Sequence, residues 1–134
     1  MHSFKVRVYF SDTDAGGIIY HARYLDFAEH ARTEMLRSVL SELSERDLSV
    51  SGMFFVVRSI NIDYLKSGYL DDVLEVQTSI ISIGAVSADI SQKIKRGEEL
   101  LVSMNVRVIF IDGIAKRPTR IPSYVRKALS CYVI

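Results

Sequence analysis

The chain has 134 residues, of which 49% are hydrophobic and 25% are charged. This length suits one domain spanning residues 1–134, and the composition is typical of a folded globular protein rather than a disordered one. Lys and Arg number 17 and Asp and Glu number 16, which leaves a formal net charge of +1. Such an even balance excludes the basic bias of a dedicated nucleic-acid-binding protein, so we expect no nucleic-acid partner.

The sequence also indicates where the protein works. Its single cysteine, Cys131, has no second cysteine for an intramolecular disulfide, and residues 1–5 lack the apolar core of a signal peptide. No uninterrupted apolar stretch approaches the roughly 20 residues that a membrane-spanning helix needs. We therefore expect a cytoplasmic location without membrane insertion.

The first predicted elements are a strand over residues 4–10 and a helix over residues 20–40. In the strand, hydrophobic residues alternate with Lys5, Arg7 and Tyr9, a pattern that predicts one buried and one exposed face. A turn-rich stretch, residues 11–17, separates the two elements. The helix is identified by hydrophobic residues at helical spacing: Tyr24, Phe27, Ala28, Ala31, Met35 and Val39. A helix of this length extends about 30 Å, enough to lie across several strands.

Four more strands follow a connection over residues 41–52, in which we expect one short helical turn. Alternating hydrophobic residues predict these strands at residues 59–64, 74–80, 86–94 and 102–110, with turn signals between them. Short connections favour antiparallel pairing. After Pro118, residues 121–129 suggest a short terminal helix. The chain is therefore predicted to be an α+β domain in which one long helix covers a five-stranded antiparallel sheet, whose two open edges favour a homo-oligomer.

Residues 12–21 carry the densest set of reactive side chains, between the first strand and the helix: Asp12, Asp14 and His21, with Gly16 and Gly17. The glycines permit a tight backbone path and the close approach of a ligand. The N–H groups at the start of the following helix have no partner within the helix and lie at the positive end of its dipole. This combination predicts a site that stabilises an anion, such as the oxyanion of a carbonyl group under attack.

The carboxylates and the histidine allow several interpretations. A carboxylate beside such a site can attack the carbonyl directly, giving an anhydride-like intermediate, or act as general base on a water, and the sequence does not separate these routes. Either aspartate could instead cap a turn or the helix, an interpretation that we favour for Asp12 and leave open for Asp14. The imidazole of His21 could orient substrate, bind a carboxylate or be purely structural.

The same segment carries a family resemblance. Residues 6–25 read VRVYFSDTDAGGIIYHARYL and residues 29–34 read EHARTE, and both closely resemble the Tol-Pal-associated acyl-CoA thioesterases. These belong to the 4-hydroxybenzoyl-CoA thioesterase branch of the hotdog superfamily. The resemblance continues through Phe55-Val56-Val57-Arg58, Asp63-Tyr64 and Leu70-Asp71-Asp72, so it covers nearly the whole chain. It implies a hotdog fold, with the sheet wrapped around the long helix, and an enzyme that hydrolyses acyl-CoA thioesters.

The resemblance also implies roles for individual residues. Asp14 takes the family's catalytic position and the backbone amide of His21 that of the oxyanion donor, while the His21 side chain matches a histidine thought to orient substrate or handle protons. The remaining loop residues expected to contact substrate are Gly16, Gly17 and Tyr20. Many members read Tyr-Tyr before the acidic motif. This chain reads Tyr9-Phe10, so the hydroxyl proposed to assist at the second position is absent.

In this family two subunits join their sheets, active sites lie at the dimer interface, and dimers often pair, so we expect a homodimer or homotetramer. In that arrangement a stretch near the acyl group would reach across from the partner subunit: Phe55, Val56, Val57, Arg58 and Ser59. Candidate contacts for the coenzyme A phosphates are Arg58, Lys66, Lys116, Arg117 and Arg120. Another hotdog branch uses a helical glutamate in catalysis, but Glu29 is predicted here to make a helix-surface or buried polar contact.

Other functions fit less well. The metal-ligand types His2, His21, His30 and Cys131 are scattered and match no standard motif, so we expect no metal. No Gly-x-Ser-x-Gly, P-loop or Rossmann pattern occurs. Three alternatives remain: a hotdog dehydratase, a non-catalytic acyl-CoA or acyl-carrier-protein binding protein, and an interaction subunit of the envelope-associated system. We expect no cofactor, because coenzyme A is part of the substrate, and the acyl chain and the carrier, coenzyme A or acyl carrier protein, stay open.

Overall fold

The computed structural model describes residues 1–40 and 52–134. The strands are β1 (His2–Arg7), β2 (Met53–Tyr64), β3 (Val73–Ile83), β4 (Ser87–Arg96), β5 (Glu99–Asp112) and β6 (Arg117–Pro118). The α-helices are α1 (Arg23–Val39) and α3 (Ser123–Leu129), and 3-10 turns span Phe10–Asp12 and Ser130–Tyr132. The helical turn predicted within residues 41–52 falls almost entirely outside the described residues. No helix in the described ranges is long and apolar enough to cross a membrane.

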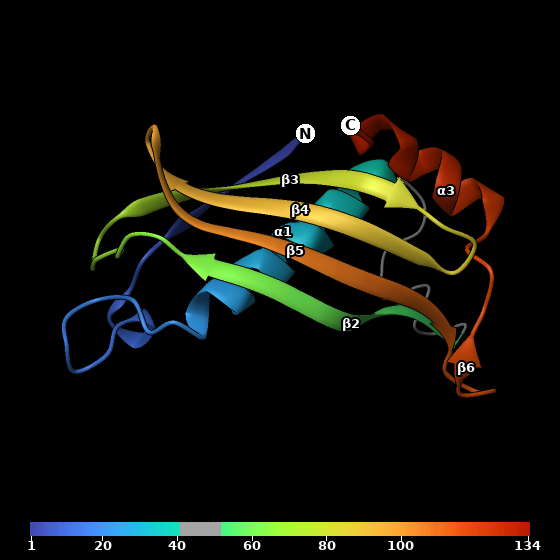
Figure 1. Ribbon diagram of the computed structural model, residues 1–134, viewed down its shortest axis with the longest axis horizontal. Coiled ribbons are helices and arrows are strands. Elements are labelled where there is room, and N and C mark those ends of the chain that lie inside the picture. The colour runs from blue at the N-terminus through green and yellow to red at the C-terminus, as the bar shows by residue number, and fades with distance from the viewer. Residues whose placement is uncertain (41–51) are drawn as a thin grey trace.

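The strands form one antiparallel sheet in the order β1-β3-β4-β5-β2, and β6 pairs with the end of β5. Helix α1 runs behind this sheet and crosses its strands, while α3 lies at one end (Figure 1). The predicted α+β class is confirmed. The predicted count of five strands is wrong, because it lacks β6, whose two residues are too few to show alternation. The predicted fold has a single long helix, but the structure has a second α-helix, α3. It lies within residues 121–129, where the sequence suggested a short terminal helix.

The main core lies between α1 and one face of the sheet. Buried and less buried residues alternate along β3, β4 and β5, as the sequence predicted. The buried residues of α1 are Tyr24, Phe27, Ala28, Ala31, Met35 and Leu36. Gln92 is a polar residue in this core, and its Nε2 donates to the backbone oxygen of Ala28 at 2.9 Å and to Thr78 Oγ1 at 3.0 Å. Because its amide is paired, Gln92 fixes α1 over the sheet instead of destabilising the core.

The first strand ends at Arg7, earlier than the predicted end at residue 10. The Asp12 carboxylate accepts a hydrogen bond from the Tyr9 N–H at 2.9 Å, and the chain turns at this point. Phe10 is consequently 80% exposed and does not belong to the buried face that the alternation predicted. A local hydrogen bond from a backbone N–H to a side-chain carboxylate has therefore overridden the strand pattern.

Strand β2 begins at Met53, before the predicted start at residue 59. Its residues 53–57 are apolar without alternation, so the pattern alone does not identify a strand there. Pairing with β5 defines it, since the register runs from Met53 opposite Asp112 to Tyr64 opposite Val102. Because β2 is last in the sheet order, its other edge has no strand beside it in the described chain.

Candidate active site

Asp14 lies in a tight loop that connects the turn Phe10–Asp12 to α1. Thr13 and Ile19 form an antiparallel bridge across the loop. The N–H of Asp14 donates to the oxygen of Ile18 at 3.0 Å, and that of Gly17 donates to the oxygen of Asp14 at 3.0 Å. Gly17 has a φ of 79°, a left-handed conformation that favours glycine. The loop thereby presents Asp14 to solvent.

One hydrogen bond within the chain orients the Asp14 carboxylate. Its Oδ1 accepts from the Gly16 N–H at 2.8 Å, and a Cβ at residue 16 would lie only 3.1 Å from this oxygen. Asp14 therefore acts as a turn residue through one oxygen. The other oxygen, Oδ2, accepts no hydrogen bond from residues 1–40 or 52–134, so it is available to a substrate or a water.

Helix α1 begins beside this loop without a capping side chain. Ala22 at the N-cap makes no side-chain hydrogen bond to the helix. The N–H of Tyr20 donates to the oxygen of Asp12 and that of Arg23 to the oxygen of Tyr20, both at 2.8 Å. The intervening N–H groups of His21 and Ala22 donate to no acceptor in the described part of the chain. Unpaired N–H groups at the positive end of a helix are suited to binding an anion.

The His21 side chain is exposed and lies among tyrosines. Its ring centroid is 4.8 Å from that of Tyr20 and 6.0 Å from that of Tyr64, both in edge-on geometry. The Tyr64 hydroxyl also donates to the backbone oxygen of His21 at 3.3 Å. The imidazole makes no hydrogen bond to Asp14 or to other described residues, so these aromatic contacts orient it.

Asp12 is structural, in line with the capping role that we favoured for it. Only 8% of the residue is exposed. Besides accepting from the Tyr9 N–H, its carboxylate lies 3.3 Å from Arg23 Nε, and Arg23 donates to the backbone oxygen of Ser11 at 3.3 Å. Asp12 thus ties the entrance of the loop to the first turn of α1.

A second loop, residues 65–72, supports the Asp14 loop. The N–H of Ile19 donates to the oxygen of Gly68 at 3.0 Å, while the N–H of Gly68 donates to the hydroxyl oxygen of Tyr24 at 3.1 Å. Burial raises the pKa of Tyr24, which keeps its phenol protonated at neutral pH. A Cβ at residue 68 would overlap with Ile19 Cδ1, so a larger residue there would displace the Ile19 side chain from between the two loops.

Arg96 in turn holds the second loop in place. Its guanidinium pairs with Asp72 and with Glu99, each at 2.7 Å, and lies 5.5 Å from the ring centroid of Tyr69. Hydrogen bonds to Glu99 and Asp72 raise the pKa of Arg96, and the bond from Arg96 lowers the pKa of Glu99. The sequence reasoning missed these supports. Asp72 lies 24 residues from Arg96 and Gly68 lies 44 residues from Tyr24, so neither contact leaves a local pattern in the sequence.

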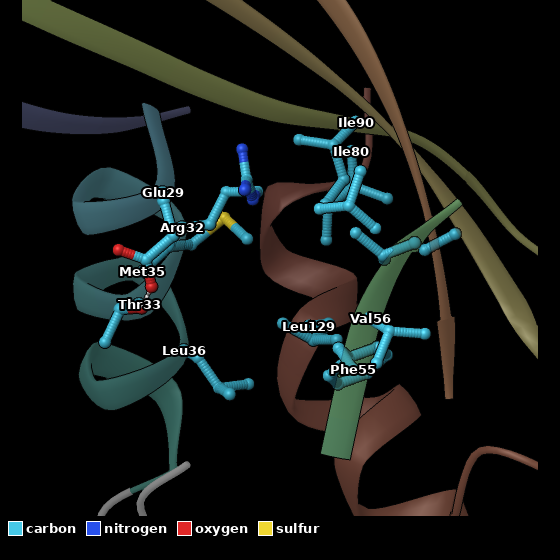
Figure 2. A pocket seen from close by; sticks show the side chains of 13 residues that line it. Glu29, Arg32, Thr33, Met35, Leu36, Phe55, Val56, Ile80, Ile90 and Leu129 are labelled. Atoms are coloured by element: carbon cyan, nitrogen blue, oxygen red, sulfur yellow. Dashed lines mark hydrogen bonds between the residues drawn. The ribbon is translucent and has the colours of Figure 1, made fainter. Parts of the chain in front are cut away.

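A separate cavity of about 140 Å³ lies between α1, β2 and α3 (Figure 2). Its wall is formed by Glu29, Arg32, Thr33, Met35, Leu36, Phe55, Val56, Val57, Ile80, Ala88, Ile90, Val108 and Leu129. Asp14 and His21 are not among them. Their loop lies at the opposite end of α1 from α3 (Figure 1). Within one chain, the exposed Asp14 carboxylate and the cavity therefore lie apart.

The other predicted substrate residues lie together on β2 but face different surroundings. Val57 lines the cavity, whereas Ser59 lines a shallow groove with Asp89 and Arg107 on the other face of the sheet. Between them the register of β2 shifts at a bulge that contains the exposed Arg58. The structure thus places Gly16 and Gly17 in hydrogen-bond contact with Asp14, and Tyr20 and His21 further along the same loop, whereas Val57 and Ser59 of the same chain lie elsewhere.

The candidate phosphate contacts do not gather in one place in a single chain. Lys66 follows the end of β2 and pairs with Glu99 at 3.1 Å. Arg117 pairs in register with Asp112, which lies opposite Met53 at the start of β2. Within the described ranges, no group of three or more His, Cys, Asp or Glu side chains is placed to hold a metal ion.

Glu29 makes the helix-surface contact that the sequence predicted. Its Oε1 accepts a hydrogen bond from Thr33 Oγ1 at 2.9 Å, one turn further along α1. The residue is exposed at the rim of the cavity.

Known proteins with similar sequence and structure identify the family. The thioesterase superfamily matches residues 16–103. The chain is 40% identical over 121 residues to the acyl-CoA thioester hydrolase YbgC of Escherichia coli, a match that covers 90% of this chain and 89% of that protein. It is 40% identical over 126 residues to the acyl-CoA thioesterase YbgC of Haemophilus influenzae, covering 94% and 92% respectively.

A solved structure agrees with these sequence matches. A probable thioesterase from Bartonella henselae superposes with a TM-score of 0.84 at 34% identity, covering 90% of this chain and 98% of that one. The residues that match the thioesterase superfamily, 16–103, include the glycines beside Asp14, the start of α1 and the supporting loop of residues 65–72. From its sequence and its fold, the chain belongs to the thioesterase superfamily of hotdog proteins, and it is a thioesterase.

Proposed function

We propose that the protein hydrolyses acyl-CoA thioesters and that Asp14 is the reacting carboxylate. One observation carries this assignment: the available Oδ2 of Asp14 belongs to the loop that leads into the uncapped start of α1, where the N–H groups of His21 and Ala22 have no acceptor in the described chain. A carboxylate and an anion-binding helix start are the two groups that attack on a thioester carbonyl needs. The YbgC relatives, which are named for the same reaction, support the substrate class.

The chemistry follows from these two groups. In one route Asp14 attacks the thioester carbonyl, the carbon–sulfur bond breaks to release the thiol, and water then cleaves the resulting anhydride. In the other route Asp14 takes a proton from a water, which attacks the carbonyl and displaces the thiol directly. In both routes the free N–H of His21 would stabilise the oxyanion. Neither route needs a cofactor beyond the coenzyme A of the substrate.

We further infer that two copies complete one site. The free edge of β2 allows pairing with a second β2 about a two-fold axis, which makes the two strands antiparallel. The Phe55 end of one strand then lies toward the Tyr64 end of the other. Since Phe55 lines the cavity and Tyr64 contacts His21, this pairing would bring the Asp14 of one copy to the cavity of its partner.

Finer parts of the assignment rest on the sequence resemblance. These are the 4-hydroxybenzoyl-CoA branch, the Tol-Pal association, the pairing of dimers into tetramers, the cytoplasmic location and acyl carrier protein as a second carrier. They stay predictions. In the two-copy arrangement, Val57 and Arg58 of one copy would approach the substrate held by the other. Basic residues at the two ends of β2, such as Lys66 and Arg117, would meet there to contact phosphates.

The test is thiol release from a panel of acyl-CoA esters by the wild type and the Asp14→Asn variant, which keeps the shape and removes the charge. We expect turnover to fall by at least about a hundredfold, equivalent to roughly 2.7 kcal/mol of transition-state stabilisation. Glu34→Gln is the matched control, because it removes a carboxylate that pairs with Arg37 on α1 outside both the loop and the cavity. It should keep wild-type turnover.

The other outcomes are equally informative. Equal activity of the wild type and Asp14→Asn would remove Asp14 from the mechanism. A wild type that binds acyl-CoA but leaves it intact after prolonged incubation would favour the non-catalytic binding protein. Reversible loss of water from a hydroxyacyl-CoA, without thiol release, would favour the dehydratase.

A further inference from the structure

The cavity between α1, β2 and α3 has an open end and a closed end. At the open end, Val57 is 43% exposed and the Glu29 side chain is 54% exposed. At the closed end, Leu36 is 5%, Ile80 1% and Leu129 4% exposed. Leu129 projects from α3 into the space between α1 and β2 (Figure 2). A group that enters past Val57 therefore ends against buried aliphatic side chains.

Size and lining define what this cavity can hold. Its volume is about 140 Å³, and most of its wall is aliphatic or aromatic. An apolar protein cavity of about 150 Å³ holds one benzene molecule, so this cavity suits an apolar group of about six carbon atoms. The charged and polar residues of the wall, Glu29, Arg32 and Thr33, follow one another along α1 and leave the closed end apolar.

The closed end is firmly built, although α3 has only seven residues. On α3, Val125 is fully buried in a second core cluster that also contains Leu36 and Leu129. Arg126 donates to the backbone oxygen of Gly84 at 2.7 Å. Beyond the helix, the N–H of Ile134 donates to the oxygen of Ile80 at 2.9 Å. These contacts anchor α3 beside the sheet, so the Leu129 side chain has a defined position at the closed end of the cavity.

We propose that Leu129, on the C-terminal helix, is the residue that limits the length of the acyl group. This inference rests on the proposed thioesterase function and assigns the cavity to the acyl group of the thioester. The acyl chain enters past Val57 and its distal carbon meets Leu129, so chains of about six carbons and a single aromatic ring fit, while longer chains are excluded.

The experiment measures kcat/KM for straight-chain acyl-CoA esters of four to twelve carbons and for benzoyl-CoA. The wild type should prefer chains of about six carbons, since each methylene that fits or clashes in an apolar pocket changes the rate by about tenfold or more. Leu129→Ala should raise the ratio of ten-carbon to six-carbon kcat/KM by at least about tenfold. Leu129→Val, a milder truncation that is easier to fold, should shift the ratio in the same direction by less.

Val125→Ala is the matched control, because Val125 is a fully buried residue of the same helix that does not line the cavity. It should lower the free energy of unfolding, but the hydrogen bonds of Arg126 and Ile134 still anchor α3 and Leu129 still ends the cavity, so the chain-length ratio should stay unchanged. An unchanged ratio in folded Leu129→Ala and Leu129→Val, or an equal shift in Val125→Ala, would overturn the role of Leu129.

Failure of this inference is distinguishable from failure of the proposed function. If the wild type releases thiol and Asp14→Asn does not, but the chain-length profile ignores Leu129, only the length limit is wrong. If no thioester is hydrolysed, binding of S-alkyl-CoA thioethers of the same lengths still compares the variants, because a thioether needs no turnover.

Discussion

Asp12 and Asp14 are the same residue type two positions apart, yet their surroundings give them different tasks. Asp12 is buried, and both of its oxygens are engaged by the Tyr9 N–H and by Arg23. Asp14 is exposed, and the Gly16 N–H engages only one of its oxygens. A carboxylate with both oxygens engaged stabilises a turn, whereas one with a free oxygen can take part in a reaction.

This difference predicts a stability effect at Asp12. Asp12→Ala should lower the free energy of unfolding by about 1–2 kcal/mol, because it removes the acceptor for the Tyr9 N–H and the partner of Arg23. Asp12→Asn should be less destabilising, since its amide oxygen still accepts from Tyr9. Urea denaturation of the three proteins gives the comparison. Equal stability of the wild type and Asp12→Ala would contradict the structural role.

At the scale of elements, two loops from distant parts of the chain form one unit. The Asp14 loop depends on the loop of residues 65–72, and Arg96 connects that loop to Glu99 across the turn between β4 and β5. Hydrogen bonds from Arg96 and Lys66 hold the pKa of Glu99 below its usual 4.5. Because the pKa of Glu99 is lowered in the folded protein, the Arg96–Glu99 pair stabilises the fold at pH values above the ordinary pKa of a glutamate. This stabilisation is lost as the pH falls through the lowered pKa.

Arg96→Gln should therefore lower the melting temperature by a few degrees at pH 7, a modest effect because the pairs are partly exposed to solvent. At a second, acidic pH below the lowered pKa of Glu99, where this carboxylate is protonated, the difference in melting temperature between the wild type and the variant should be smaller. Circular dichroism melts at the two pH values measure it. A gap of the same size at both would show that Arg96 acts through packing rather than through charge.

At the scale of the molecule, the proposed function uses a second copy to bring Asp14 and the cavity together, because they lie apart in one chain. The protein should therefore have twice the chain mass of 15.2 kDa, or a multiple of that, in analytical ultracentrifugation. Subunit mixing tests the shared site. Asp14→Asn keeps the cavity and Val57→Trp would block its entrance, so each variant alone should be inactive. In a mixed dimer, however, the intact Asp14 of one copy faces the open cavity of the other.

After joint refolding of equal amounts, half of the dimers are mixed and each has one working site, so about a quarter of the wild-type activity should return. Samples of each variant refolded separately and then combined serve as the control. If no activity returns although mixed dimers form, Asp14 and the cavity do not build a common site across the two-fold axis.

Patterns that are local in the chain were readable from the sequence. The spacing of hydrophobic residues predicts the buried face of α1. The alternation of hydrophobic and polar residues predicts the buried faces of three strands, β3, β4 and β5. The residues around Asp14 were equally accessible, because loop, glycines and helix start follow one another within residues 12–23 and their geometry depends on local hydrogen bonds. The family followed from the same stretch.

The early end of β1, the early start of β2 and the supports of the site needed the tertiary structure. Met53 becomes a strand residue because Asp112 lies opposite it, and Arg96 supports the site because Asp72 and Tyr69 lie beside it. The cavity likewise joins residues as far apart as Glu29 and Leu129. The sequence by itself determined the fold class, the family and the local site around Asp14. Only the tertiary structure decided what supports the Asp14 loop and which residues line the cavity, because both depend on contacts between residues that lie far apart in the chain.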